Sequence, residues 1–384
     1  MPLSAPARFS LQTCLQDIPA SSWDALSAGH VFLRHAFLLA LQQSNCANTN
    51  TGWGANFLLM HRGEHLCGAV PLYLKHHSRG EYVFDQGWAQ AYLRNGLDYY
   101  PKLLVAVPFT PVGGPRLLTT HPQDKLLLAR QLQQLAQDNQ LSSVHVLFPS
   151  TQDRQALEQA GFMIRHDVQF HWHNRDYDDY EAFLADMTQQ KRKKLRQDSR
   201  KIADQGITFQ HREGTDLGEH ELDYFYQCYA NTYTERGQIP YLTRDFFARL
   251  RTHMPENLTL ILARRDGRNI ASALSLHDGQ TLYGRYWGCT HYVPGLHFET
   301  CYIQAIRYCI AQRLQRFEGG AQGEHKLSRG LVPAATCSAH WMTDPRFAQA
   351  VGQFLNDEAG QVARYRDSLA AHTPFKARPS QDQS

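Results

Sequence analysis

The sequence predicts an α/β (α+β) protein built from two similar halves, each a mixed sheet flanked by helices. Three observations lead to this prediction: a length of 384 residues, a hydrophobic hairpin that occurs twice, and the order of strands and helix after the second hairpin. A chain of this length exceeds what one compact core usually holds. Apolar residues make up 42% of the sequence, which supplies enough material for two cores.

The first half contains one strand-like and two helical segments before its hairpin. These segments are 9–15, 22–26 and 32–43. The hairpin has apolar strands at 56–61 and 65–74 around the turn Arg62-Gly63-Glu64. Apolar strands on either side of a short turn with glycine are typical of a β-hairpin.

A second hairpin of the same kind occurs in the second half of the chain. Its apolar strands are 258–263 and 269–277, around the turn 265–268. It follows a helical segment, 224–233, at a distance similar to that in the first half. Aligning Gly63 with Gly267 also matches the apolar residue Val70 with the apolar residue Leu274. A repeated order of elements indicates an internal duplication.

The second half continues beyond its hairpin with a strand, a helix, a short strand and a loop. These elements are expected at 281–287, 298–314, 315–318 and from 319 on. The helix has an apolar stripe at helical spacing, and Glu299 in its first turn suits the helix dipole. The order strand–strand–strand–helix–strand resembles the core of the GNAT acyltransferase fold. That likeness predicts the fold and says little about chemistry.

Polar residues at 171–180 indicate where the two halves join. We therefore expect a first GNAT-like half at 1–174 and a second at 175–372. The second half ends in a helix, 345–369. The polar, proline-containing residues 373–384 are predicted to be a disordered tail.

Composition excludes several classes of protein. A formal charge of +3 is nearly balanced and argues against a surface that is wholly a nucleic-acid footprint. The N-terminal 20 residues lack the pattern of a signal peptide, and the densest apolar run, 103–109, is too short to cross a bilayer. The eight cysteines occur singly, which is typical of reduced thiols in the cytosol. We expect a cytoplasmic protein without a transmembrane segment.

The loop 319–330 has the composition of a catalytic site for N-acyl transfer. Its glycines let a ligand approach the main chain closely. The acceptor amine must lose a proton, for which Glu324 or His325 is a candidate base. The oxyanion that forms needs a cation or a donor, and Lys326 is a candidate. The alternative interpretation is a solvated polar loop that follows a strand.

The run 191–201 has seven basic residues and one acidic residue. At helical spacing Arg192, Arg196 and Arg200 share one stripe, while Leu195 and Ile202 face the core. Such a stripe can contact the phosphates of a CoA, a tRNA end or a nucleotide-linked substrate. A solvated helix face is the alternative.

Two segments of the first half, 85–92 and 99–116, are dense in aromatic residues, proline and glycine. The proline within 107–109 suggests an interrupted or edge strand that leaves backbone groups free for a ligand. His171 and His173 could lie on one side of a strand, but no third metal ligand is evident, so no metal is expected. The sequence has no nucleophile elbow, Walker loop or dinucleotide-binding turn.

Several separated segments together resemble the FemAB-like family of predicted N-acyltransferases, a branch of the GNAT superfamily. They are 84–92, 98–102, 107–111 with 114–116, 191–201, 240–243 with 246–247, 320–326 with 329–330, and 340–341. The resemblance extends over residues 30–369 and implies two tandem GNAT-like halves, as in the Fem peptidyltransferases. Those enzymes add amino acids from aminoacyl-tRNA to peptidoglycan precursors.

The resemblance also implies an enzyme that joins an acyl group to an amine. It leaves the donor open between acyl-CoA and aminoacyl-tRNA, with no cofactor bound. On this interpretation the catalytic residues come from the loop, and phosphates bind to Arg192, Arg196 and Arg200. The residues expected to bind substrate are Asp85, Trp88, Tyr99, Lys102, Thr110, Arg116, Tyr286, Trp287 and Arg329.

Three functions are consistent with the sequence. The first is an N-acyltransferase acting on a small-molecule donor, or on tRNA, and an amine acceptor. The second is a non-catalytic module that binds a peptidoglycan or other cell-envelope intermediate. The third is a nucleic-acid binder that works through residues 191–201.

Overall fold

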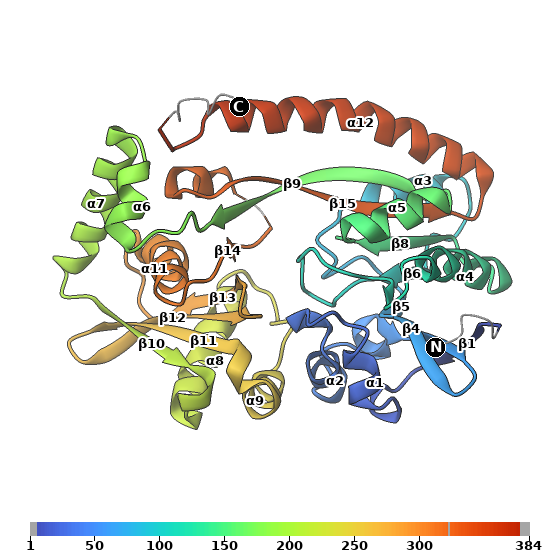
Figure 1. The fold of residues 1–384 in the computed structure, drawn as a ribbon, viewed down its shortest axis with the longest axis horizontal. Coiled ribbons are helices and arrows are strands. Elements are labelled where there is room, and N and C mark those ends of the chain that lie inside the picture. The colour runs from blue at the N-terminus through green and yellow to red at the C-terminus, as the bar shows by residue number, and fades with distance from the viewer. Residues whose placement is uncertain (1–5, 322, 377–384) are drawn as a thin grey trace, which may run out of the picture. The chain divides into compact units, whose positions relative to one another are not determined.

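The computed structural model of the protein describes residues 6–321 and 323–376. The chain forms two compact units, each described here by itself. Unit 1 contains Met1–Val168, Tyr241–His253 and Ala335–Arg364, and unit 2 contains Gln169–Pro240, Met254–Ala334 and Tyr365–Ser384. The units are therefore not two contiguous halves, because 241–253 and 335–364, which the sequence prediction placed in the second half, group with the first unit (Figure 1).

Unit 1 has two sheets and several covering helices. Its strands are β1 (Arg8–Gln12), β2 (Trp53–Ala55), β3 (Phe57–Arg62), β4 (His65–Val70), β5 (Leu72–Lys75), β6 (Lys102–Val105), β7 (Leu118–Thr119) and β8 (Ser143–Leu147). Its helices are α1 (Ala20–Asp24), α2 (His35–Gln43), α3 (Gln86–Arg94), α4 (Asp124–Asp138), α5 (Thr151–Gln159) and α9 (Arg244–His253). One sheet has the order β1-β3-β4-β7; in the other, β2, β5, β6 and β8 are adjacent in turn, with β6 parallel to β8.

Two strands and the last helix pass from one unit to the other. They are β9 (Met163–His173), β15 (Val332–Met342) and α12 (Pro345–Ala371). Within unit 1, residues 338–342 of β15 pair antiparallel with β8, and His340 lies opposite His145.

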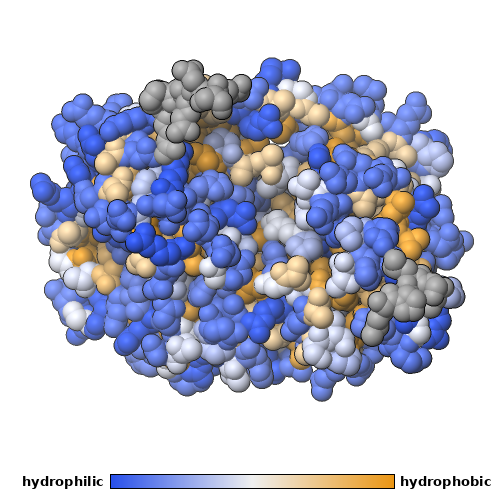
Figure 2. All heavy atoms as spheres, viewed as in Figure 1, coloured by the Kyte–Doolittle hydropathy of each residue, from blue (hydrophilic) through white to orange (hydrophobic). Residues whose placement is uncertain are grey.

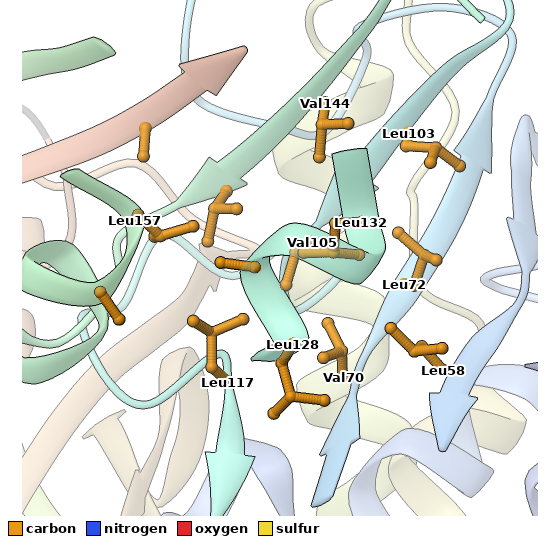
Figure 3. Packing of buried hydrophobic residues seen from close by; sticks show 14 of the residues in the cluster. Leu58, Val70, Leu72, Leu103, Val105, Leu117, Leu128, Leu132, Val144 and Leu157 are labelled. Atoms are coloured by element: carbon orange, nitrogen blue, oxygen red, sulfur yellow. The ribbon is translucent and has the colours of Figure 1, made fainter. Parts of the chain in front are cut away.

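The core of unit 1 forms where α4 packs on the sheets. Leu128 and Leu132 of α4 lie against Val70, Val105 and Val144 from three strands (Figure 3). All five side chains are fully buried. Each buried side chain of this kind contributes about 1.5–3 kcal/mol, so this layer fixes the strands that carry the polar residues of unit 1.

Unit 2 is one sheet with helices on its faces. Its strands are β10 (Thr208–Glu213), β11 (Leu258–Arg265), β12 (Arg268–His277), β13 (Thr281–Cys289) and β14 (Arg316–Glu318), in the order β10-β11-β12-β13-β14-β9. Its helices include α6 (Tyr180–Asp186), α7 (Gln189–Ala203), α8 (Glu219–Thr234), α10 (Leu296–Phe298) and α11 (Gln304–Ala311). β13 and β14 are parallel and the other neighbours in this part are antiparallel. The predicted strands, the helix after them and the basic helix are all present.

The duplicated hairpins share one register, including an irregularity at the same place. In β3–β4 the register shifts between Met60 and His61, and in β11–β12 it shifts between Ala263 and Arg264. These positions correspond with an offset of 203 residues, whereas aligning Gly63 with Gly267 gives 204. The glycine alignment was therefore wrong by one residue, because Gly63 is the first residue of its two-residue turn and Gly267 is the second of its turn. The corrected offset matches Val70 with Ala273 and strengthens the duplication.

The helix predicted at 298–314 begins earlier and is interrupted. It starts at Leu296 after Gly295, whose φ of 87° favours glycine, and contains a π-helical turn at Glu299–Ile303 before α11. Within this turn the Glu299 carboxylate accepts hydrogen bonds from Ser199 Oγ at 2.7 Å and Gln304 Nε2 at 2.9 Å. Turns of this kind are frequent at functional sites.

The prediction of a disordered tail from residue 373 was wrong for its first four residues. Thr188 N donates to Pro374 O at 2.9 Å, and Lys376 N donates to Asp186 O at 3.0 Å. These bonds satisfy backbone groups at the end of α6, so the polar segment 373–376 lies against that end of the helix. Residues 377–384 lie outside the described residues.

Three further features concern the described residues. None of their helices combines the length and apolar character needed to cross a bilayer. All eight cysteines are free thiols. No group of three or more His, Cys, Asp or Glu side chains within 6–321 and 323–376 is placed to hold a metal ion.

Gly288 on β13 provides a test of how α8 packs on the sheet. A Cβ at this position would lie 1.7 Å from the Cys228 carbonyl oxygen of α8. We expect Gly288→Ala to push α8 off the sheet and to destabilise the protein by about 3 kcal/mol, measured by urea unfolding. Gly87→Ala in α3 is the control, because a Cβ there meets nothing within 4 Å, and its effect should stay within about 0.5 kcal/mol. Equal stability of the two variants would contradict this packing.

Candidate functional site

A basic groove of about 700 Å³ lies along α6 and α7 in unit 2. The predicted stripe Arg192, Arg196 and Arg200 lines it, as do Lys193 of α7 and Arg307 of α11. The one carboxylate in its lining is Glu181, which forms an ion pair with Arg196. Five cationic side chains therefore face one anionic side chain, and such a groove attracts anions.

The sequence of α7 explains why its charges gather on one side. Leu195 and Ile202, seven positions apart on the helix, are buried, so the basic side chains between them point elsewhere. In the view of Figure 2 the surface at the left, where Figure 1 places α6 and α7, is mainly hydrophilic. On the groove wall, the Arg307 guanidinium lies 4.0 Å from the centre of the Tyr180 ring, which orients its charge.

A second cavity of about 390 Å³ lies on another side of α7. It is bounded by the start of the helix at Gly295 and Phe298, by Lys194 and Lys201 of α7, and by Arg329 of the loop. Ser199 lines both this cavity and the basic groove. The predicted substrate-binding residue Arg329 is thus placed beside basic residues of α7.

Arg329 is held by the loop and by an aromatic ring. Its Nη1 donates to the carbonyl oxygen of His325 at 2.6 Å, and its guanidinium lies 3.7 Å from the centre of the Phe298 ring. Burial lowers the pKa of Arg329, although the nearby Tyr302 and Asp198 act in the other direction. The guanidinium remains a fixed positive charge at neutral pH.

The three predicted catalytic residues lie in one turn of helix, Glu324–Arg329. Glu324 is exposed and accepts a hydrogen bond from the Tyr365 hydroxyl at 2.7 Å. His325 is also exposed, with Nε2 3.3 Å from the Tyr302 hydroxyl. Partial burial, helped by the charges of Arg329 and Lys326, lowers the pKa of His325, so its imidazole is neutral at pH 7.

Lys326 points the other way and is 1% exposed. Its Nζ donates to the Gly320 carbonyl oxygen at 2.6 Å. Burial, together with the charge of Arg285, lowers the pKa of Lys326 to about 8. An ammonium in this position can donate to a developing oxyanion and is poised to lose its proton.

A buried carboxylate close to this loop in sequence, Glu318, was not predicted. It ends β14, where it pairs with Tyr283 of β13 and His171 of β9. Its Oε1 lies 3.2 Å from Arg316 Nε, and its Oε2 lies 3.9 Å from His171 Nε2. Burial raises the pKa of Glu318 to about 7 against the opposing charge of Arg316. An acidic residue that ends a short strand just before two glycines is the signal that could have identified it.

In unit 1, three predicted substrate-binding residues, Asp85, Tyr99 and Lys102, meet in one buried polar network. Lys102 Nζ donates to Ser78 Oγ at 2.9 Å, to Glu81 Oε2 at 2.8 Å and to Asp85 Oδ2, which uses all three of its hydrogens. The Tyr99 hydroxyl donates to the same Asp85 oxygen at 2.7 Å. The ammonium is satisfied inside the protein, whereas Glu81 Oε1 and Asp85 Oδ1 accept no hydrogen bond from the described residues.

The network continues from Tyr99 through two histidines. The Tyr99 hydrogen is used by Asp85, and His145 Nε2 lies 3.0 Å from the Tyr99 oxygen and 2.8 Å from Ser143 Oγ. His145 Nδ1 lies 2.7 Å from His340 Nδ1, so one imidazole donates to the other, and His340 Nε2 lies 2.7 Å from Ser338 Oγ. Trp88 packs beside both imidazoles, with its ring centre 4.8 Å from that of His340. Both histidines are neutral because burial lowers their pKa values, that of His340 to about 3.

The two remaining predicted residues of unit 1 bond to nearby main chain. Thr110 Oγ1 donates to Pro108 O at 3.0 Å. Arg116, fully buried, donates to the carbonyl oxygens of Leu147, Pro115 and Val112 at 2.9, 2.9 and 2.5 Å. Both side chains are buried, and main-chain carbonyl groups accept hydrogen bonds from their donors.

The predicted residues Tyr286 and Trp287 of β13 face different neighbours. Tyr286 is buried, and its ring centre lies 5.7 Å from that of Tyr229 in α8. Trp287 is partly buried, with its ring centre 5.3 Å from that of His297, two residues after Gly295. Trp287 is thus the member of this pair on the side of the helix that borders the second cavity.

The histidine pair predicts a pH dependence of stability. The unfolded chain binds a proton at His340 below pH about 6.5 and the folded chain does not, so stability is complete above this pH and falls as the pH drops. Between pH 7 and pH 5 the free energy of unfolding of the wild type should fall by about 2 kcal/mol more than that of His340→Asn, measured by urea unfolding. His166→Asn, at an exposed histidine, should behave as the wild type. An unchanged pH dependence in His340→Asn would show that His340 binds its proton normally.

Comparison with solved structures shows the fold. FemX matches with a TM-score of 0.53 and 12% identity over 87% of this chain and 98% of its own. A conserved protein of unknown function from Bacteroides thetaiotaomicron matches with a TM-score of 0.51 and 12% identity over 87% and 99%. L-PGS from Bacillus licheniformis matches with a TM-score of 0.50 and 11% identity over 83% and 96%. The fold is therefore mixed α/β with sheets flanked by helices, as predicted.

The sequence comparisons give the family. The chain matches no curated protein sequence. The profile of the FemAB-like family, described as peptidoglycan biosynthesis/recognition, matches residues 14–377. The chain belongs to the FemAB-like family, as the resemblance of its separated segments predicted.

Proposed function

We propose that the protein is an N-acyltransferase of the FemAB-like and GNAT type, which transfers an acyl or aminoacyl group to an amine acceptor such as a peptidoglycan precursor. The observation that carries the proposal is the basic groove, in which five cationic side chains of a GNAT-like unit face one carboxylate. Family membership and the fold support the same class of reaction.

The groove suits an acyl donor attached to a phosphorylated carrier. Acyl-CoA and aminoacyl-tRNA both bring phosphates, which arginines bind through two parallel hydrogen bonds. Arg192, Arg200 and Arg307 line the groove beside the pair Arg196–Glu181. Both carriers occur in the cytoplasm, where we place the reaction, and the eight free thiols fit a reducing compartment.

The loop after β14 supplies groups for the chemical step. The ammonium of the acceptor must lose a proton, for which Glu324 and His325 are the candidates predicted from the sequence. The amine then attacks the acyl carbon, and an oxyanion forms. Lys326, close to the glycine-rich backbone, and Arg329 are the cations that would stabilise it.

Charge reversal in the groove tests how the donor binds. We expect Arg192→Glu with Arg200→Glu to weaken binding of CoA or tRNA by about 100-fold, because each lost charge-assisted contact contributes about 1.5–3 kcal/mol. Fluorescence anisotropy over a range of salt concentrations measures this effect, and for tRNA the salt slope should fall by about 2. Arg268→Glu, at the exposed first residue of β12, is the control. Binding that stays unchanged in the double variant would contradict a donor site in the groove.

Replacing Lys326 tests the loop. Lys326→Met keeps the length of the side chain and removes the donor, so kcat should fall by about 100-fold while KM changes little. The assay is transfer from acetyl-CoA or alanyl-tRNA to an amine, with Lys191→Met as the matched control. Thermal unfolding verifies that both variants are folded. Tight donor binding without turnover in the wild type would instead favour the alternative, a non-catalytic module that binds a cell-envelope intermediate.

A further inference from the structure

One carboxylate of unit 2 has a setting that packing alone does not explain. Glu318 ends the short strand β14, between β13 on one side and β9 on the other. Its side chain is 6% exposed. The next residue, Gly319, begins the loop that carries Lys326 and Arg329, so the carboxylate lies where the last core strand meets the candidate site.

The partners of Glu318 are incomplete. Oε1 forms an ion pair with Arg316 at 3.2 Å, but Oε2 accepts no hydrogen bond from any residue that the structure describes. The nearest imidazole nitrogen, His171 Nε2, is 3.9 Å from Oε2. A buried acceptor left without a hydrogen bond costs about 1–3 kcal/mol, so this arrangement is unfavourable for stability.

A buried carboxylate of unit 1 shows what a better-paired arrangement looks like. Asp85 Oδ2 accepts from both Lys102 and Tyr99 in a network that excludes water. Lys102 and Asp85 keep their charges, because the mutual attraction raises the pKa of Lys102 and lowers that of Asp85. Asp85 Oδ1, like Glu318 Oε2, accepts no hydrogen bond from the described residues, but the other oxygen of Asp85 has two donors, whereas Glu318 has the ion pair with Arg316.

Charged and titratable groups surround Glu318 on every strand beside it. Arg316 lies on its own strand, His171 on β9, Tyr283 and Arg285 on β13, and Asp278 in the turn before β13. Burial raises the pKa of Glu318 to about 7, Asp278 adds to the rise, and the two arginines oppose it. His171 is neutral, because burial and the charge of Arg316 lower its pKa to about 3.

We infer that Glu318 is the general base of the acyl transfer, acting on the acceptor amine directly or through one water. This inference rests on the proposed function and replaces the exposed Glu324 and His325 as the base. The Glu318 carboxylate takes one proton from the acceptor ammonium, and the free amine attacks the acyl carbon of an ester or thioester. The C–N bond forms and the C–O or C–S bond to the carrier breaks. The carrier leaves as an alcohol or thiol with the second amine proton, and Glu318 returns its proton to water.

The three candidate bases differ in their surroundings. Glu324 and His325 are exposed, and the Glu324 carboxylate is already bonded to the Tyr365 hydroxyl. Glu318 alone of the three is almost fully removed from water. A base works best when its proton affinity matches the operating pH, and burial is the means by which proteins raise that of a carboxyl group.

The test compares Glu318→Gln with the matched variants Glu324→Gln and His325→Asn in the full chain. Transfer from acetyl-CoA and from alanyl-tRNA is measured with two acceptors, Nα-acetyl-lysine and hydroxylamine. For the lysine derivative we expect Glu318→Gln to lower kcat by about 100-fold or more, further than Glu324→Gln or His325→Asn does, and to remove the acid limb near pH 7. Hydroxylamine is already neutral at pH 7, so it needs no base and the loss should be less than about 10-fold.

A second measurement does not depend on activity. Infrared difference spectra of protein with ¹³C-labelled glutamate, wild type against Glu318→Gln, report the titration of this one carboxyl group, which we expect near pH 7. Circular dichroism confirms that the variant is folded.

The two measurements distinguish a failure of the role proposed for Glu318 from a failure of the proposed function. Wild-type turnover and an intact acid limb in Glu318→Gln, or a Glu318 band that titrates in the ordinary carboxyl range, would overturn the role of Glu318 and leave the proposed function standing. An absence of transfer by the wild type with every donor would overturn the proposed function and the base together, even if Glu318 titrates near pH 7.

Discussion

Charge buried away from water is the constraint on which the polar parts of this protein depend. An ionised group in the interior costs several kcal/mol unless partners satisfy it. In unit 1 the Lys102 ammonium meets this requirement, because its three hydrogens reach three oxygens, although Glu81 Oε1 and Asp85 Oδ1 accept no hydrogen bond from the described residues. Burial also lowers the pKa of the neighbouring Lys75 to about 7. In unit 2 Glu318 has an ion pair on one oxygen, and Lys326 donates to a single carbonyl group among the described residues. Lys102 therefore has three partners for its charge, whereas Glu318 and Lys326 have one each.

That difference separates residues that hold the structure from residues that can exchange protons. In unit 1 a chain of hydrogen bonds extends from Lys102 to Ser338. If both Nδ1 atoms of His145 and His340 carried a proton, two donors would face each other at 2.7 Å. The network therefore links the segment 335–342 to the strands of unit 1 and resists protonation. Glu318 Oε2 accepts no hydrogen bond from the described residues, so a proton can bind there without breaking one, and burial raises the pKa of this carboxyl group to about 7.

Much of the fold was readable from the sequence because its signals are local. Apolar runs around short turns located β3–β4 and β11–β12, and the order of elements identified the duplication. The register was misjudged by one residue because glycine occupies a different place in each turn. The return of 241–253 and 335–364 to unit 1 was not readable, since it depends on contacts far apart in the chain. The same limit applies to residues 373–376, whose order comes from backbone bonds to 186–188.

The sequence could predict which residue types the candidate site contains better than how those residues are arranged. Residue types alone identified the basic stripe, because Leu195 and Ile202 define the buried face of α7 and so the direction of Arg192, Arg196 and Arg200. Residue types could not distinguish Lys102 or Arg116, whose donors serve the protein itself, from cations that line a groove. Burial shifts the pKa of an ionisable group, and a short sequence motif does not show whether its residues are buried.

Residues of the helix α7 line both cavities of unit 2. Its Ser199 lines both cavities and donates to Glu299 in the π-helical turn, so the wall between them is tied to the helix that starts at Gly295. Arg329 lines the second cavity and is bonded to the loop that follows Glu318. The helix α7 also packs against the helical turn Glu324–Arg329. Phosphates bound by α7 would therefore be held by a helix that contacts the loop to which the proposed function assigns the chemical step, whereas a groove on an isolated surface helix would have no such contact.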